Sequence, residues 1–218
     1  MVDDATSKAR YRFTIQQLRI LAIKLQLPHD GIITSAGDRV GKVEDLAVVC
    51  RRLSEASTLL TVASEFGRST AAYSRIVSAT VRLLYVQHKD ILYFHGFLIK
   101  TRIEDYCTTI HAASSPIQSC WGFIDGTKQY ISRPSAREKS NIPNKNLQRS
   151  VFNGHMNWDK KQRVRQSTAD LNLYVAILLF NCHTCLQPLP IPNGPLGNQI
   201  SMYFGLMPPT LDPYLCAN

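Results

Sequence analysis

An aspartate at the end of a strand-like segment is the residue whose surroundings most clearly suit chemistry. In residues 120–131 (CWGFIDGTKQYI), alternate positions face opposite sides of a strand, so the carboxylate of Asp125 shares a face with the aromatic side chains of Trp121 and Phe123. The Gly-Thr pair that follows supplies a turn, and the last four residues are typical of the returning arm of a hairpin. The pattern therefore predicts a carboxylate at the end of a partly buried strand, where surface solvation alone does not explain it.

Positive charge is concentrated beside this segment. The chain has 25 Lys and Arg residues against 16 Asp and Glu, a formal net charge of +9, and residues 128–165 alone hold ten basic and two acidic residues and carry +8. Such a cluster is typical of a surface that binds the phosphodiester backbone of nucleic acid, and a solvated loop is the alternative. The candidate DNA contacts in it are Lys128, Arg133, Arg137, Lys139, Lys145 and Arg149.

The preceding part of the chain has the periodicity and capping residues of helices. Thr14 and Gln17 form a capping box that begins a helix at Ile15. Glycines between residues 29 and 42 indicate a loop, with a small hairpin that turns at residues 36–38. Further amphipathic helices are expected at about 43–55, 58–66, 70–88 and 97–113. The residues expected to face inward from them include Cys50, Leu60, Tyr73, Ile76, Val77, Thr80 and Leu84.

Two of these helices are separated by a short turn that is typical of a helix-turn-helix. The first ends at Gly67, and Ser69 is the expected N-cap of the second. On the second helix Arg75 and Arg82 are seven residues apart and share a face, and Arg68 lies a further seven residues back. These three arginines and Ser69 are therefore the candidate contacts of a recognition helix with phosphates and groove edges. The alternative is an ordinary helical bundle with a polar outer face.

Two motifs resemble the DDE nuclease domain of Harbinger-type transposases. Residues 121–127 (WGFIDGT) are similar to the family's first strand of an RNase H-like sheet, and residues 148–155 (QRSVFNGH) are similar to a later strand of the same domain. The resemblance covers roughly residues 13–155 and includes a helix-turn-helix region directly before the nuclease. It implies duplex DNA as the partner, a nuclear location and a nuclease dependent on a divalent metal, Mg²⁺ or Mn²⁺.

The resemblance gives Asp125 the role of first catalytic carboxylate and metal ligand. DDE nucleases hold two divalent metals on carboxylates from separate elements, and one carboxylate is rarely sufficient. The second and third carboxylates stay unassigned, because none of the later acids stands in the family's Gly-Pro-x-Glu-Gly context. The acids after residue 138 are Asp159, Asp170 and Asp212.

The expected protein is therefore a transposase-derived DNA-binding protein that truncation of the catalytic domain has made inactive. One alternative is an active metal-dependent DNA endonuclease and strand transferase. The other is a helical interaction protein without a nucleic-acid partner.

The sequence changes character after Arg165, beyond which there is no Lys or Arg. Seven of the chain's eleven prolines fall between Pro188 and Pro213, so we expect a tail that does not fold, apart from an opportunistic strand or short helix in the apolar run 171–180. The segment 182–185 (CHTC) has the spacing of half a zinc site, and no second pair completes it.

The expected fold class is α+β, in four parts. They are a disordered lead (1–12), a helical, helix-turn-helix-like DNA-binding region (13–95), an incomplete RNase H-like α/β domain (96–165) and an irregular, proline-rich tail (166–218). No secretory signal is expected, because the start (MVDD) lacks a basic region followed by an apolar one. No membrane partner is expected, because the longest apolar run is well short of the ~20 residues that a membrane span needs.

Overall fold

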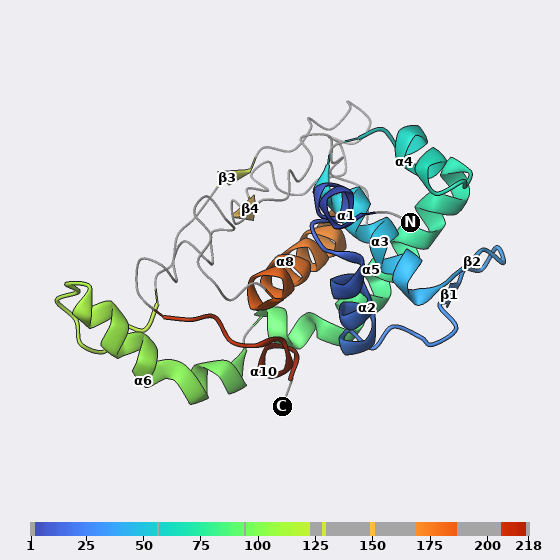
Figure 1. Ribbon diagram of the computed structural model, residues 1–218. Helices are drawn as coiled ribbons and strands as arrows, with labels where there is room; N and C mark the ends of the chain where they lie inside the picture. Colours follow the sequence, from blue (N-terminus) through green and yellow to red (C-terminus); the bar gives the residue numbers. More distant parts are fainter. Residues whose placement is uncertain are drawn as a thin grey trace, which may run out of the picture.

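The structure is a computed structural model that describes residues 3–55, 57–93, 95–122, 128–129, 149–150, 169–186 and 206–216. Most of these residues are helical, and the described strands form two short antiparallel ladders (Figure 1), which confirms an α+β chain in which helices predominate. The helices are α1 (Asp4–Tyr11), α2 (Ile15–Lys24), α3 (Lys42–Ser54), α4 (Leu59–Glu65), α5 (Thr70–Tyr93), α6 (Gly96–Ala112), α8 (Ala169–Leu186) and α10 (Leu211–Leu215). The strands are β1 (Ile32–Ile33), β2 (Arg39–Val40), β3 (Lys128–Gln129) and β4 (Arg149–Ser150).

Local sequence signals set the beginnings of the helices. The side chain of Thr14 accepts a hydrogen bond from the backbone N–H of Gln17 at 3.1 Å, and the Gln17 side chain accepts one from the backbone N–H of Thr14 at 2.9 Å. This is the predicted capping box, and α2 begins at Ile15 as expected. The C-terminal end of α5 was not predicted from neighbouring residues, since the helix continues past the expected end at His88 to Tyr93.

α5 is the axis of the core. All five of the residues predicted to face inward from it are buried: Tyr73, Ile76, Val77, Thr80 and Leu84. α3 packs on one part of α5 and α8 on another, and Figure 1 shows α8 (orange) in the middle of the helical bundle. The Tyr73 hydroxyl donates to the backbone carbonyl of Val48 in α3 at 3.0 Å, so the largest buried side chain of α5 also satisfies its polar atom.

A buried arginine joins α3 to α4. The guanidinium of Arg51 donates to both carboxylate oxygens of Glu65 at 2.9 Å each, and to Glu55 at 2.5 Å. α4 buries Val62, whereas Leu60 is 71% exposed, and the prediction that Leu60 faces inward is therefore wrong. Two residues turn a helix by about 200°, so Leu60 lies on nearly the opposite side from Val62.

α1 corrects the prediction of a disordered lead at residues 1–12. The side chain of Asp3 caps the helix by accepting from the backbone N–H of Thr6 at 2.9 Å, and the Ser7 hydroxyl donates to the Phe13 carbonyl at 2.8 Å. Tyr11 is buried, with its ring 6.3 Å from that of Phe66. The polar composition of this segment concealed a short helix that buries one side only.

α8 corrects the prediction that the chain after Arg165 does not fold. It is an 18-residue helix whose buried side chains belong to the same core as those of α1 to α5. Among them, Val175, Leu178, Leu179 and Cys182 are fully buried. The burial of α8 explains why this helix contains no Lys or Arg, because a helix with apolar residues on nearly all sides is typical of a protein core. Of the helices in the described ranges, none is long and apolar enough to cross a bilayer.

α10 shows that part of the proline-rich end is also ordered, although residues 187–205 lie outside the described residues. Leu211 and Tyr214 are buried, and Asp212 pairs with Lys24 of α2 at 2.6 Å. The ring of His95 donates from Nε2 to the Tyr214 carbonyl at 2.6 Å, while its Nδ1 accepts from the backbone N–H of Leu98 and caps α6. The C-terminal segment is thus tied to α2 and to the beginning of α6.

The strand segment around Asp125 is described only in part. Trp121 is 48% exposed and belongs to no strand, contrary to the prediction of a partly buried strand there. β3 pairs antiparallel with β4, with Lys128 opposite Ser150 and Gln129 opposite Arg149. Residues 123–127, 130–148 and 151–168 lie outside the described residues, and most of the expected RNase H-like domain falls among them.

Candidate nucleic-acid interface

α4 and α5 are joined by the short glycine-containing turn that the sequence predicted. Gly67 has a φ of +61°, a conformation that favours glycine, and its backbone N–H donates to the Ser64 carbonyl at 3.0 Å. The Ser69 hydroxyl accepts from the backbone N–H of Ala72 at 3.2 Å, as expected of an N-cap. We call the surface that carries the predicted contacts Arg68, Ser69, Arg75 and Arg82 the α5 arginine face.

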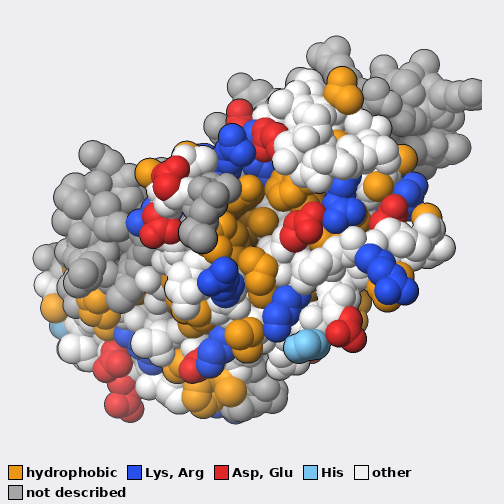
Figure 2. Space-filling model, turned by 45° about the vertical axis from the view of Figure 1, so that its right-hand side comes forward, with side chains coloured by type: hydrophobic (Ala, Val, Ile, Leu, Met, Phe, Trp, Pro, Cys, Tyr) orange, Lys and Arg blue, Asp and Glu red, His pale blue; other side chains and the backbone are white. Residues whose placement is uncertain are grey.

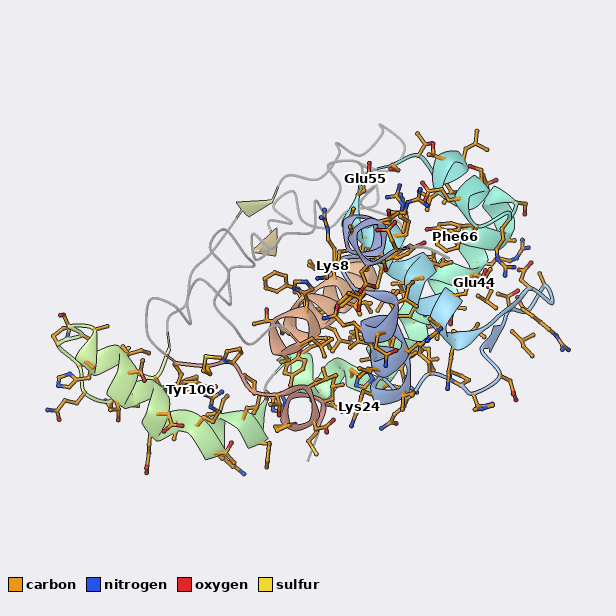
Figure 3. The ribbon with its side chains drawn as sticks, viewed as in Figure 1. Lys8, Lys24, Glu44, Glu55, Phe66 and Tyr106 are labelled. Atoms are coloured by element: carbon orange, nitrogen blue, oxygen red, sulfur yellow. The ribbon has the colours of Figure 1, made fainter. Side chains whose placement is uncertain are left out.

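Arg68 makes an ion pair with α3. Its Nη2 lies 2.8 Å and its Nε 3.1 Å from Oε1 of Glu44, and Nη2 also donates to the Arg39 carbonyl of β2 at 3.2 Å. Figure 3 shows Glu44 on the side of α3 that faces the β1–β2 hairpin. The guanidinium of Arg68 therefore joins three elements: the turn before α5, the first turn of α3 and the hairpin.

Arg75 makes a bidentate ion pair with the tip of the same hairpin. Its Nε lies 2.7 Å from Oδ2 of Asp38 and its Nη2 lies 3.1 Å from Oδ1. The Thr34 hydroxyl donates to Oδ2 of Asp38 at 2.6 Å. The hydrogen bond from Arg75, followed by that from Thr34, lowers the pKa of the Asp38 carboxyl to about 2, so the carboxylate is charged throughout the physiological range.

Arg82 is the arginine of this face that makes no ion pair within the described part of the chain. It is exposed on α5, two turns after Arg75, and Ser74 is exposed on the same helix. Figure 2 shows Lys and Arg side chains interspersed with Asp and Glu over the side that carries the hairpin, rather than one continuous positive field. The α5 arginine face is thus partly neutralised by acids of the chain itself.

The other predicted contacts lie on β3 and β4 or outside the described residues. The structure describes the backbone of Lys128 and Arg149, on neighbouring strands. Arg133, Arg137, Lys139 and Lys145 fall outside the described ranges, as does the predicted metal ligand Asp125. Within those ranges, no group of three or more His, Cys, Asp or Glu side chains is placed to hold a metal ion.

The CHTC segment lies within α8 and faces the core. Cys182 is fully buried, Cys185 is nearly so, and burial raises the pKa of both thiols. Cys50 of α3, predicted to be a small core residue, is also fully buried, which confirms the prediction. The three thiols pack as small apolar side chains in the core.

A buried aspartate is the residue that sequence reasoning missed. Asp45 of α3 is fully buried, its Oδ1 lies 2.5 Å from the Thr80 hydroxyl of α5, and within the described structure no donor reaches its Oδ2. Burial raises the pKa of Asp45 to about 7. The signal that could have found it is position: Asp45 directly precedes the buried run of α3, and Thr80 was already expected to face inward.

Comparison with known proteins adds no assignment, since no family model, no curated protein and no solved structure matches this chain.

Proposed function

We propose that the chain binds duplex DNA through the helix-turn-helix of α4 and α5, with α5 as the recognition helix. The observation that carries this proposal is Arg82, which is exposed and makes no ion pair with any described residue, on the long helix that follows a tight glycine turn. An arginine there contacts a backbone phosphate by a charge-assisted hydrogen bond. A nuclear location goes with this proposal.

Other exposed groups at the beginning of α5 fit phosphate contacts better than base contacts. The hydroxyl groups of Ser69 and Ser74 are exposed there, and hydroxyls are common donors to phosphate oxygens. Arg39 of β2 is also exposed, and its backbone carbonyl is bonded to Arg68, so the hairpin brings a further cation near the turn. Phosphate contacts position a protein on DNA without reading its sequence, and we therefore expect binding with little sequence preference.

Replacing Arg82 by Ala should weaken binding to a duplex and make it less sensitive to salt. Each phosphate contact releases condensed counterions, so losing one should reduce the slope of log K against log salt by about 0.9. The measurement is fluorescence anisotropy with a labelled duplex at four or more salt concentrations. Lys100→Ala is the matched control, because Lys100 is exposed on α6, which extends from the opposite side of the bundle (Figure 1).

Equal slopes for Arg82→Ala, Lys100→Ala and the unaltered chain would remove α5 from the interface. Absence of binding at low salt would reject the proposal as a whole and favour a helical interaction protein. Nicking of the duplex that requires Mg²⁺ or Mn²⁺ and disappears in Asp125→Ala would replace the proposal with an active nuclease.

A further inference from the structure

Two of the three arginines that a duplex would need are already bound to carboxylates. Asp38 takes both Nε and Nη2 of Arg75, and Glu44 takes the same two nitrogens of Arg68. A carboxylate offers the same planar pair of oxygens that an arginine recognises in a phosphate. In the unbound chain, Asp38 and Glu44 therefore bind the same guanidinium nitrogens with which Arg75 and Arg68 could contact phosphates.

The hairpin presents Asp38 in a fixed position. The Thr34 hydroxyl donates to Asp38 Oδ2 at 2.6 Å, and the backbone N–H of Thr34 donates to the Asp38 carbonyl at 3.0 Å. Gly37, with a φ of +82°, allows the tight turn between them. Because the carboxylate is held by its own turn, pairing with Arg75 requires little further ordering of the acid side chain.

One partner of each ion pair is open to solvent and can be exchanged. The side chains of Arg75 and Glu44 are 41% and 42% exposed, whereas those of their partners Asp38 and Arg68 are 16% and 23% exposed. Exposed ion pairs contribute little to stability and are screened by salt. The phosphates of a duplex, at high local charge density, can therefore replace the two carboxylates without unfolding the bundle.

We propose that Asp38 and Glu44 are masking acids, which hold Arg75 and Arg68 away from DNA and limit the affinity of the α5 arginine face. This inference rests on the proposed function, because it concerns how that same face is regulated. It predicts that the unaltered chain binds through fewer phosphate contacts than its arginines would allow, and that removing the charge of either acid adds one contact, through Arg75 for Asp38 and through Arg68 for Glu44.

Asp38→Asn in the full chain should therefore raise affinity for the duplex about three- to tenfold at 0.15 M salt and increase the salt slope by about 0.9. Asn keeps the shape of the side chain and still accepts from Thr34. Asp30→Asn is the matched control: it removes the same charge from the loop before β1, where Asp30 lies 3.3 Å from His29 and pairs with none of the described arginines. In the double variant Asp38→Asn/Arg75→Ala, the gain should disappear.

Glu44→Gln is a second variant, on α3 rather than on the hairpin, and should raise the slope through Arg68 even if Asp38→Asn disturbs the turn. Salt-dependent binding by the unaltered chain, with no difference between Asp38→Asn, Glu44→Gln and Asp30→Asn, would overturn the masking role and leave the proposed function standing. Weaker binding by both variants would also overturn it, since the acids would then be positioning the arginines. If none of the proteins binds DNA at low salt, the proposed function fails, and the masking role fails with it.

Discussion

Replacing Leu179 by Ala should lower the free energy of unfolding by about 2–5 kcal/mol. Leu179 is fully buried on α8, in the core shared with α3 and α5, so truncation removes apolar contacts and leaves a cavity. The measurement is urea denaturation followed by circular dichroism. Leu60→Ala is the control, since Leu60 is 71% exposed on α4 and its truncation should change stability by less than about 0.5 kcal/mol.

Deleting the chain after Arg165 should have a larger effect, because it removes α8 and α10 and uncovers the apolar side of α5. We expect the remaining chain to lose its cooperative unfolding transition. A truncated protein that unfolds at the same urea concentration as the full chain, together with a neutral Leu179→Ala, would contradict the placement of α8 in the core and restore the view of an unfolded tail.

Asp45→Asn should stabilise the protein at pH 8 and have little effect near pH 4. The pKa of Asp45 is about 7 in the folded chain, above its ordinary value of 3.8, so folding favours the neutral form. The stability that depends on this proton is present at acidic pH and is lost as the pH rises from about 4 to about 7, a loss of about 4 kcal/mol at most. Asn is neutral at every pH and should abolish this loss.

The hydrogen-bond geometry around Asp45 independently favours the protonated carboxyl, and therefore a raised pKa. The Thr80 hydroxyl lies 2.5 Å from Asp45 Oδ1 and 2.8 Å from the Ile76 carbonyl, and with a single proton it can donate to only one of them. If the Asp45 carboxyl is protonated, it donates to Thr80, and Thr80 donates to Ile76. Both contacts are then hydrogen bonds. If Asp45 is ionised, the Thr80 oxygen faces either the carboxylate or the Ile76 carbonyl without a proton between the two oxygens.

The pH series should compare Asp45→Asn with the unaltered chain and with Asp90→Asn, an exposed acid on α5. The comparison is needed because His88 acts in the opposite direction. Burial lowers the pKa of His88, so its contribution to stability is lost as the pH falls through the normal titration range of histidine. Parallel pH curves for Asp45→Asn and Asp90→Asn would show that Asp45 is ionised in the fold.

The sequence predicted those parts of the fold that depend on neighbouring residues. The capping box at Thr14, the glycine turn before α5 and the inward face of α5 follow from spacings of a few residues, which fix hydrogen bonds and helix faces locally. α8 was misjudged because the absence of Lys and Arg after Arg165 and the prolines that follow were interpreted as a tail that does not fold, whereas an apolar helix without basic residues also suits a core. Pro213 was no obstacle to α10, since it lies in the first turn, where its missing N–H has no helical partner.

The spacing of the arginines in the candidate site could be predicted from the sequence, but the acids that pair with them could not. The pairs Arg68–Glu44, Arg75–Asp38 and Asp45–Thr80 join residues that are 24, 37 and 35 positions apart. Such separations carry no periodic signal, because they depend on how the hairpin and α3 pack on α5. The sequence therefore showed that the arginines share a face but not that acids of the chain already occupy two of them.

The placement of α8 against α5 also has a consequence for synthesis. The ribosome must translate about 75 further residues between the end of α5 at Tyr93 and the beginning of α8 at Ala169. At 5–20 residues per second this takes roughly 4–15 s, far longer than a helix needs to form. During that interval the nascent helices present an uncovered apolar surface, and we expect chaperones that bind exposed apolar segments to engage the chain before α8 emerges.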